Sequence, residues 1–175
     1  MKYLRLRPVH WFSVGILVFL VIFLNRPDNI APKMVGAAPG QIVTAYRVVS
    51  SADDQWLEAF SVRLPPHVEP MLGSLRVMTL LKPEESPLPP GTRVLSVTLR
   101  DNGVAWADFS AAFVRNFPGG SLRESLAISS VLLTLSQFPD VRAVQFTVEG
   151  KVISSLGGHE DISGPQEVPG QQSRT

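Results

Sequence analysis

The stretch that decides the fold is FPGGSLRESLAISSVLLTLSQFP, residues 117–139. Apolar side chains recur over most of its helical circumference, and a proline near each end bounds the helix. The remaining polar side chains form one narrow stripe: Arg123, Ser130, Thr134 and Gln137. A helix this apolar has to be covered on more than one side, so the pattern predicts the central helix of the core.

The beginning of this helix has the pattern of a capping box. Ser121 is followed three residues later by Glu124, so the two side chains are expected to satisfy backbone N–H groups of the first turn. Pro118, Gly119 and Gly120 precede the helix. They contain no lysine and no phosphate-loop spacing, which favours a loop-to-helix joint with positive φ over an anion site.

A β-hairpin is predicted immediately before this stretch. Leu95, Val97 and Leu99 alternate with polar residues, and Asp101-Asn102-Gly103 follows them. Asn-Gly is a strong hairpin signal because both residues accept positive φ, so Val104–Phe109 is the expected return strand. Within that strand Phe109 is predicted to be core, and Asp108 or Ser110 to cap the next turn.

Two further strand pairs flank this centre. Residues 42–49 and 56–64 both alternate, which predicts an N-terminal hairpin. After the central helix, residues 141–148 predict a strand containing Phe146, and Glu149-Gly150 a tight turn into a short return over 151–154. Trp56 and Trp106 are interpreted as core or hairpin packing rather than a glycan platform.

A second amphipathic helix is predicted between Pro65-Pro66, which can open it, and Pro83, which ends it. The order is therefore ββαββαββ. It predicts a single compact α+β domain over residues 41–163, with two helices packed on one antiparallel or mixed β-sheet.

The N-terminal part of the chain predicts a membrane helix. Trp11–Leu24 is almost entirely apolar and follows a basic segment, residues 1–10, which is expected to stay in the cytoplasm. The run is short enough for a cleaved signal peptide, with Ala38 near the nearest small-residue site, but its distance from that site favours a retained signal-anchor. Residues 25–40 are interpreted as a linker, and residues 164–175 as a disordered tail.

Composition excludes several classes of function. The chain has 175 residues and no cysteine, which excludes disulfides, thiolate metal sites and a cysteine nucleophile. Beyond residue 38 acidic side chains outnumber basic ones, so no nucleic-acid partner is expected.

Few residues suggest chemistry. Ser121, His159 and Asp161 could be drawn as a hydrolase triad, but Ser121 lacks the G-x-S-x-G context. His159-Glu160-Asp161 could offer metal ligands, although neighbouring loop residues rarely face one site, and a turn after Gly157-Gly158 explains them better. No catalytic, cofactor-binding or metal-binding residue is therefore predicted.

Four ordered blocks of the chain resemble the GerMN domain family of sporulation and spore-germination proteins. The blocks are PLPPGTRVLSVTLRDNGVAWADFS (87–110), FPGGSLRESLAISSVLLTL (117–135), FPDVRAVQFTVEGK (138–151) and LGGHEDIS (156–163). The residues carrying the motif are Asp108, Phe109, Ser110, Pro118, Gly119, Gly120, Ser121, Glu124, Phe146, Gly150, Gly157 and Gly158. The resemblance gives them structural or interaction roles, and no catalytic residue comes with it.

The resemblance implies a compact α+β domain, exported and held at the cytoplasmic membrane, that is similar to ring-building modules of envelope assemblies. Two features depart from the family pattern, since the chain lacks a lipobox cysteine and holds one copy of the domain where the namesake carries two. The expected function is that of a non-enzymatic module that binds envelope proteins through a sheet edge or a helix face. The resemblance to ring-building modules suggests that it is one element of a ring. The alternative is a module that binds peptidoglycan or regulates a cell-wall hydrolase.

Overall fold

The computed structural model describes residues 40–170, and the chain divides into two units, residues 1–37 and 38–175. The predicted anchor Trp11–Leu24, nearly all of the predicted linker and residues 171–175 lie outside the described part. Within residues 40–170, no helix combines the length and the apolar character that crossing a membrane requires.

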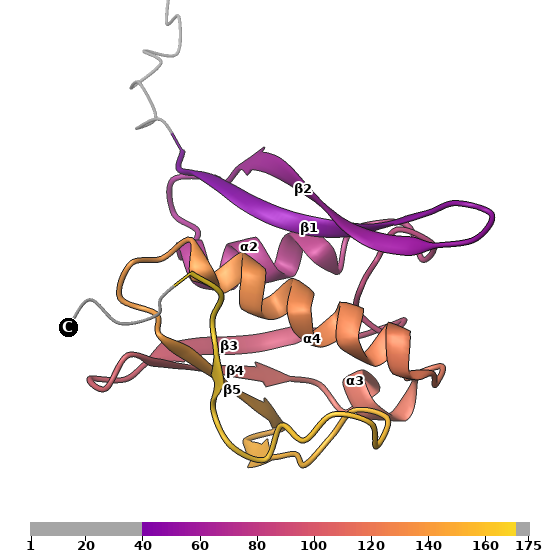
Figure 1. Ribbon diagram of the computed structural model, residues 1–175. Coiled ribbons are helices and arrows are strands. Elements are labelled where there is room, and N and C mark those ends of the chain that lie inside the picture. The colour runs from indigo at the N-terminus through magenta and orange to yellow at the C-terminus, as the bar shows by residue number, and fades with distance from the viewer. Residues whose placement is uncertain (1–39, 171–175) are drawn as a thin grey trace, which may run out of the picture. The chain divides into compact units, whose positions relative to one another are not determined.

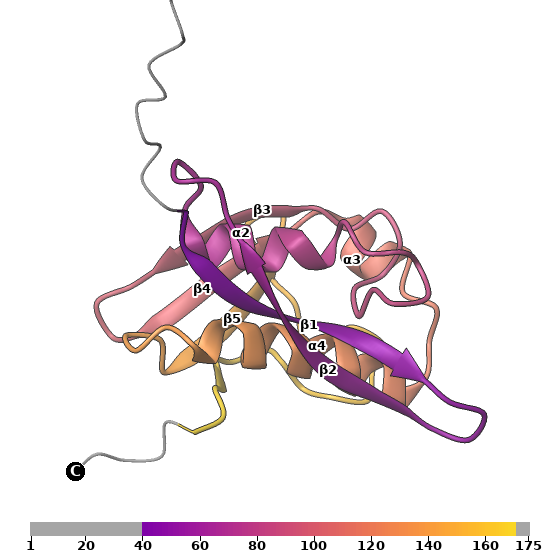
Figure 2. The same ribbon diagram turned by 90° about the horizontal axis from the view of Figure 1, so that it is seen from above.

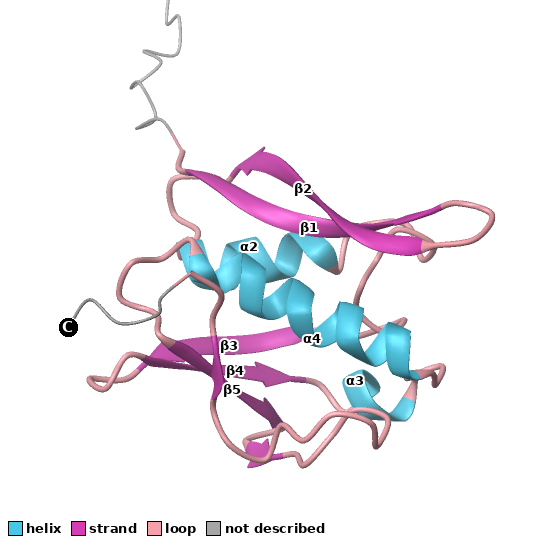
Figure 3. Cartoon of the chain, in the orientation of Figure 1, coloured by secondary structure: helices cyan, strands magenta, loops and turns pink. Residues whose placement is uncertain are grey.

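The second unit has its helices between two sheets (Figures 1 and 3). Helices α2 (Pro70–Met78) and α4 (Ser121–Ser136) form the middle layer. On one side lies a two-stranded sheet, β1 (Ile42–Ser50) and β2 (Gln55–Arg63). On the other lies a five-stranded sheet made of β3 (Val94–Leu99), β4 (Val104–Phe109), β5 (Ala143–Val148), β6 (Lys151–Val152) and β7 (Gln166–Glu167).

The α+β class is confirmed, but the prediction of one sheet is wrong. Strands β1 and β2 pair antiparallel with each other and with no other strand. The physical reason lies in α4, whose apolar surface is too wide for one sheet to cover. The N-terminal hairpin covers the side of the helices that the larger sheet leaves exposed.

The larger sheet is mixed. Strands β3 and β4 pair antiparallel, whereas β4 and β5 pair parallel because α4 makes the crossover between them. Both predicted turns are present, since Gly103 has φ 79° and the Glu149-Gly150 pair has φ 50° and 78°. In the first turn only Gly103, and not Asn102, has the positive φ that the Asn-Gly signal suggested.

The polar stripe of α4 is buried in its middle and exposed at Arg123. Ser130 and Thr134 are fully buried, whereas Leu122 is 49% exposed. The Ser130 hydroxyl donates to the Ala127 carbonyl of its own helix at 2.7 Å, and the Thr134 hydroxyl donates to the Met78 sulfur on α2 at 3.7 Å. Small hydroxyls that find partners nearby can be buried at little cost. The prediction of a central core helix is confirmed, but the helix buries Ser130 and Thr134 and exposes Leu122.

Helix α2 begins later than predicted. Its N-cap is Glu69, whose carboxylate accepts hydrogen bonds from Met71 N and Leu72 N, and Pro70 occupies the first helical position. Pro65 and Pro66 therefore end β2 without opening a helix. A further short helix, α3 (Ala112–Arg115), was not predicted.

The predicted disordered tail is wrong for residues 164–170. Strand β7 pairs antiparallel with β5, and the Val168 N–H donates to the Arg142 carbonyl at 3.0 Å. Val168 is only 4% exposed. Prolines and glycines in this segment suggested disorder, yet a single buried valine and a two-residue pairing hold it on the sheet.

The two tryptophans differ in their environments. Trp56 on β2 is 44% exposed, so the prediction that it is packed does not hold for this residue. Trp106 on β4 is partly buried, and the Arg100 guanidinium lies over its ring at 3.5 Å from the centroid. Both residues belong to the β3–β4 hairpin, so this cation–π contact confirms the prediction of hairpin packing for Trp106.

Candidate functional site

Glu124 is the centre of one cluster of motif residues. It is fully buried in the first turn of α4, yet it does not reach back to the helix start. Its carboxylate instead accepts hydrogen bonds from Leu156 N at 3.0 Å, Gly157 N at 2.8 Å and His159 N at 3.0 Å. Burial raises the pKa of Glu124, but these backbone donors outweigh it and leave the pKa below its ordinary value.

The predicted capping box is therefore wrong. The N-cap of α4 is Gly120, with no side-chain hydrogen bond, and Ser121 is an exposed residue at the first helical position. Gly119 and Gly120 have φ of 87° and 96°, which confirms a joint that needs positive φ. Glu124, which the sequence pattern predicted as the capping partner, instead bonds a loop more than thirty residues away. A local pattern cannot show a contact with so distant a segment.

Gly157 shows how tightly this cluster packs. A side-chain carbon there would overlap the ring of Phe117 and approach Glu124 Oε2 at 3.1 Å. Gly158 has φ 90° and open space around it, so it serves the turn. Pro118, Gly119, Gly120, Glu124, Gly157 and Gly158 thus belong to one structural joint between α4 and the loop at residues 156–159.

Of the other motif residues, all but the exposed Ser121 form a second joint, at the end of the parallel strands. One carboxylate oxygen of Asp108 accepts hydrogen bonds from Thr147 Oγ1 at 2.8 Å and from Gly150 N at 2.9 Å. Asp108 therefore caps the β5–β6 turn rather than the turn that follows its own strand. Ser110 Oγ accepts from Arg93 N at 3.0 Å.

Aromatic packing supports this second joint. The Phe109 ring stacks on Phe113 with centroids 4.3 Å apart, and its centroid lies 6.3 Å from that of Phe146. All three side chains are fully buried. The prediction of Phe109 as core is confirmed.

Within residues 40–170, no hydrogen bond joins the side chains of Ser121, His159 and Asp161, the residues considered for chemistry. Asp161 Oδ1 accepts from Ser163 N at 2.9 Å, and the hydrogen bonds from Ser163 lower the pKa of Asp161. The His159 backbone, rather than its ring, is what bonds Glu124. Among residues 40–170, no group of three His, Cys, Asp or Glu side chains is placed to hold a metal ion.

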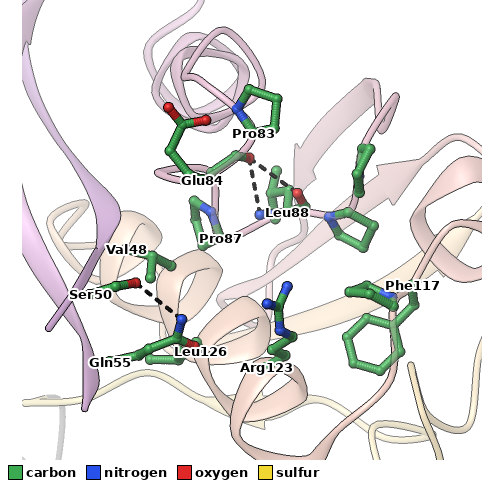
Figure 4. A pocket seen from close by; sticks show the side chains of 14 residues that line it. Val48, Ser50, Gln55, Pro83, Glu84, Pro87, Leu88, Phe117, Arg123 and Leu126 are labelled. Carbon is green, nitrogen blue, oxygen red and sulfur yellow. Dashed lines mark hydrogen bonds between the residues drawn. The ribbon is translucent and has the colours of Figure 1, made fainter. Parts of the chain in front are cut away.

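A groove of about 450 Å³ lies beside the first joint (Figure 4). The proline-rich loop after α2, residues 83–90, forms one wall, and the start of α4 with Phe117 forms the other. Asn116 Nδ2 donates to the Pro90 carbonyl at 2.8 Å, and Leu88 N donates to Ser86 Oγ at 3.2 Å, so the loop is held in shape. The Arg123 side chain points toward this loop from α4.

The proline-rich loop was not singled out from the sequence, and Arg123 was treated only as part of a polar stripe. Within the described residues the Arg123 side chain has no hydrogen-bond or carboxylate partner, while the groove around it is mostly apolar. Four prolines within eight residues were the available signal, because such a loop keeps a fixed surface shape.

Comparisons with known proteins agree with this architecture. Two solved structures from Bacillus subtilis are similar: the tandem GerMN domains of the sporulation protein GerM (TM-score 0.60, 19% identity) and the first GerMN domain alone (TM-score 0.59, 20% identity). The first match covers 75% of this chain and 46% of the tandem chain, so this chain spans about half the length of that relative. The second covers 74% of this chain and 98% of the single domain.

At these identities the likeness shows the fold alone. No curated protein sequence matches the chain. The family model named Germane, described as sporulation and spore germination, matches residues 48–154, which is more than half of the chain. By that match, and with the fold of two solved GerMN domains, the chain belongs to the Germane, or GerMN, family of sporulation and spore germination.

Proposed function

We propose that this chain is a non-enzymatic interaction module of the bacterial cell envelope, acting in sporulation or spore germination. It is held at the outer face of the cytoplasmic membrane by residues 11–24, with its N-terminus inside. Its partners are other envelope proteins. Membership of the Germane family supports the biological setting, and the apolar run with its basic flank supports the anchor.

One observation carries the proposal that the module binds rather than catalyses. The polar motif residues Asp108, Ser110 and Glu124 all bond within the fold, which is how structural polar groups behave. The groove, in contrast, presents an unpartnered guanidinium among apolar side chains (Figure 4). A fixed, mostly apolar surface with two charged side chains, Arg123 and Glu84, suits recognition of a protein segment.

Crosslinking with mass spectrometry on the full-length chain in its native membranes tests this function, in growing and in sporulating or starved cells. We expect envelope proteins to be recovered, chiefly in the sporulating cells. Arg123→Glu should reduce their recovery, whereas Arg115→Glu, which changes an exposed arginine outside the groove, should not. Equal recovery from both variants would exclude the groove as the binding surface.

Two further variants separate binding from catalysis. Ser121→Ala and His159→Ala should keep full function in a sporulation or germination assay, and removal of residues 1–24 should abolish it. Loss of function in either point variant, with the domain still folded, would contradict a non-enzymatic role.

The alternative function is binding of peptidoglycan or regulation of a cell-wall hydrolase. The exposed Trp56 side chain favours it, because exposed aromatic rings stack on sugars and Trp56 is 44% exposed. Sedimentation with purified sacculi tests this alternative. Retention of the wild-type chain and loss of retention in Trp56→Ala would support it over protein recognition.

A further inference from the structure

Two strand edges of the domain have no neighbouring strand. Strand β2 pairs only with β1, and β3 pairs only with β4. The hydrogen bonds from Leu64 N to the Gln41 carbonyl and from Ser51 N to the Asp54 carbonyl fix the phase of the β1–β2 ladder. The bond from Arg100 N to the Val104 carbonyl fixes that of β3–β4.

These phases identify the backbone groups that point away from each sheet. On β2 they belong to Leu57, Ala59 and Ser61, and on β3 to Val97 and Leu99. Within residues 40–170 none of these outward N–H and C=O groups has a partner from another strand or from a side chain. An unpaired edge of this kind is a template for a strand from another chain.

The other edge of the small sheet is closed at two positions, whereas the β3 edge is capped only at its start, where Arg76 Nε donates to the Val94 carbonyl at 3.2 Å. Gln137 of α4 receives a hydrogen bond from Thr44 N at 2.8 Å and returns one to the Thr44 carbonyl at 2.8 Å. Val48 N donates to the Glu85 carbonyl at 2.8 Å. The fold therefore caps β1 from the side and leaves β2 open along its nine residues.

The open edges lie in different layers and beside different helices. Strand β2 contacts α4 in the small sheet, while β3 contacts α2 in the large one (Figure 2). They cannot pair with each other within one molecule. The β2 edge of one copy and the β3 edge of another remain available to each other.

Charges at the ends of the two strands are complementary in one direction. Asp53 and Asp54 precede β2, and Arg93 precedes β3, beside Arg76. At the far ends, Arg63 closes β2, and Arg100 and Asp101 follow β3. A parallel pairing brings opposite charges together at the first ends and places Arg63 beside both Arg100 and Asp101, whereas an antiparallel pairing sets Arg63 against Arg93.

Apolar side chains add to this complementarity at the start of β3. A groove of about 420 Å³ runs between the end of α2 and the beginning of β3. Leu80 and Leu95 border it, and they are 82% and 37% exposed. Exposed leucines beside an open strand edge gain by being covered.

We propose that copies of this chain associate head to tail, with the β2 edge of one copy adding in parallel to the β3 edge of the next. The inference rests on the proposed function as an interaction module and identifies a second copy as one of its partners. Because the two surfaces differ, each copy keeps one edge open for a further copy, and the contact builds a closed ring or an extended array.

Engineered cysteines test the contact, since the chain contains no cysteine of its own. One full-length chain carries Gln55→Cys together with Leu95→Cys, and a second carries Ser61→Cys together with Leu95→Cys. Both chains are compared in their native membranes under mild oxidation. Parallel pairing joins the first pair between copies and produces a ladder on a non-reducing gel. The second pair, which antiparallel pairing would join, should crosslink little. Maleimide labelling confirms that each cysteine reacts.

A charge exchange tests the register without altering the strands. In the Gln55→Cys, Leu95→Cys background, Arg93→Glu should reduce the crosslinked fraction about threefold to fivefold, the range of exposed ion pairs. Adding Asp54→Arg to the same chain should restore it. Arg115→Glu, which changes an exposed arginine on α3 rather than on either strand, is the matched control and should leave the ladder unchanged.

The outcomes separate this inference from the proposed function. Reactive cysteines that give no ladder, or a ladder from the Ser61→Cys pair instead, overturn the head-to-tail contact. If envelope proteins are still recovered by crosslinking in that case, the interaction module stands and only self-association fails. A ladder that is lost in Arg93→Glu and restored by Asp54→Arg supports both.

Discussion

At the scale of single residues, Glu124 has the most consequence for the fold. A buried carboxylate that accepts three backbone hydrogen bonds joins α4 to the loop at residues 156–159. Replacing it leaves those donors without a partner in a buried place. Glu124→Ala should therefore lower the free energy of unfolding by about 3 kcal/mol or more, from charge-assisted hydrogen bonds worth about 1.5–3 kcal/mol each. Urea titration measures the loss.

The acid limb of the stability curve gives a second readout for Glu124. Its pKa in the folded state is lowered, so its contribution is present above the ordinary glutamate pKa and is lost as the pH falls through the lower folded value. Wild-type stability should thus fall more steeply with acid than that of Glu124→Gln, which cannot titrate. Urea midpoints of the two chains from neutral to acid pH measure this, and parallel curves would contradict it.

Gly157 carries a separate prediction at the same scale. A methyl group there meets the Phe117 ring and Glu124, so Gly157→Ala should destabilise the domain by about 1–3 kcal/mol, the usual cost of overpacking. Gly164→Ala is the matched control, because a side-chain carbon at Gly164 meets nothing within 4 Å. Thermal unfolding of both variants compares them. Equal melting temperatures would show that the ring moves aside.

At the scale of elements, the Gln137 amide takes the place of a neighbouring strand at one position of β1. It bonds both backbone groups of Thr44. Gln137→Ala should speed hydrogen exchange of the Thr44 N–H and lower stability by about 1–2 kcal/mol, as expected for two lost hydrogen bonds. Gln55→Ala, an amide that bonds only the Ser50 hydroxyl, should change neither. Unchanged exchange at Thr44 in Gln137→Ala would remove the amide from this role.

Local signals in the sequence predicted the elements that local physics decides. Asp101-Asn102-Gly103 and Glu149-Gly150 mark their turns by residue types that accept positive φ, at Gly103, Glu149 and Gly150. The start of α2 was missed although its signal, Glu69 before Pro70, is local. The use of Glu124 was missed because it depends on a distant loop. The Ser121–Glu124 spacing fitted a cap, and the tertiary contact prevailed over it. No local pattern separates these outcomes.

At the scale of the whole domain, the number of layers was the feature that sequence periodicity could not give. Alternation showed that β1 and β2 were strands, and it was silent on which sheet they join. The groove was likewise out of reach, since it forms where Val48, the proline-rich loop and Arg123 meet from three separate elements. The motif glycines Gly119, Gly120, Gly150 and Gly158, in contrast, were placed at joints from sequence because positive φ is a property of single residues.

The ordered C-terminal segment gives the prediction at this scale. Val168 is 4% exposed and holds β7 against the sheet, whereas Val152 on β6 is 46% exposed. Val168→Ala should lower the free energy of unfolding by about 1–2 kcal/mol, and Val152→Ala by less than about 0.5 kcal/mol, because only the first opens a cavity. Chemical denaturation compares the pair. Equal losses would show that β7 contributes nothing to the core.

The bond between Glu124 and the loop also has a consequence for biosynthesis. The ribosome makes Glu124 thirty-two residues before Leu156, the first of its donors. Until that later segment has emerged, the carboxylate has no partner and stays in water, because a charge is not buried unpaired. A nascent or truncated chain that lacks residues 156–159 therefore cannot close the end of α4. Completion of the domain waits for its last third, and a chain cut short is left open to proteases.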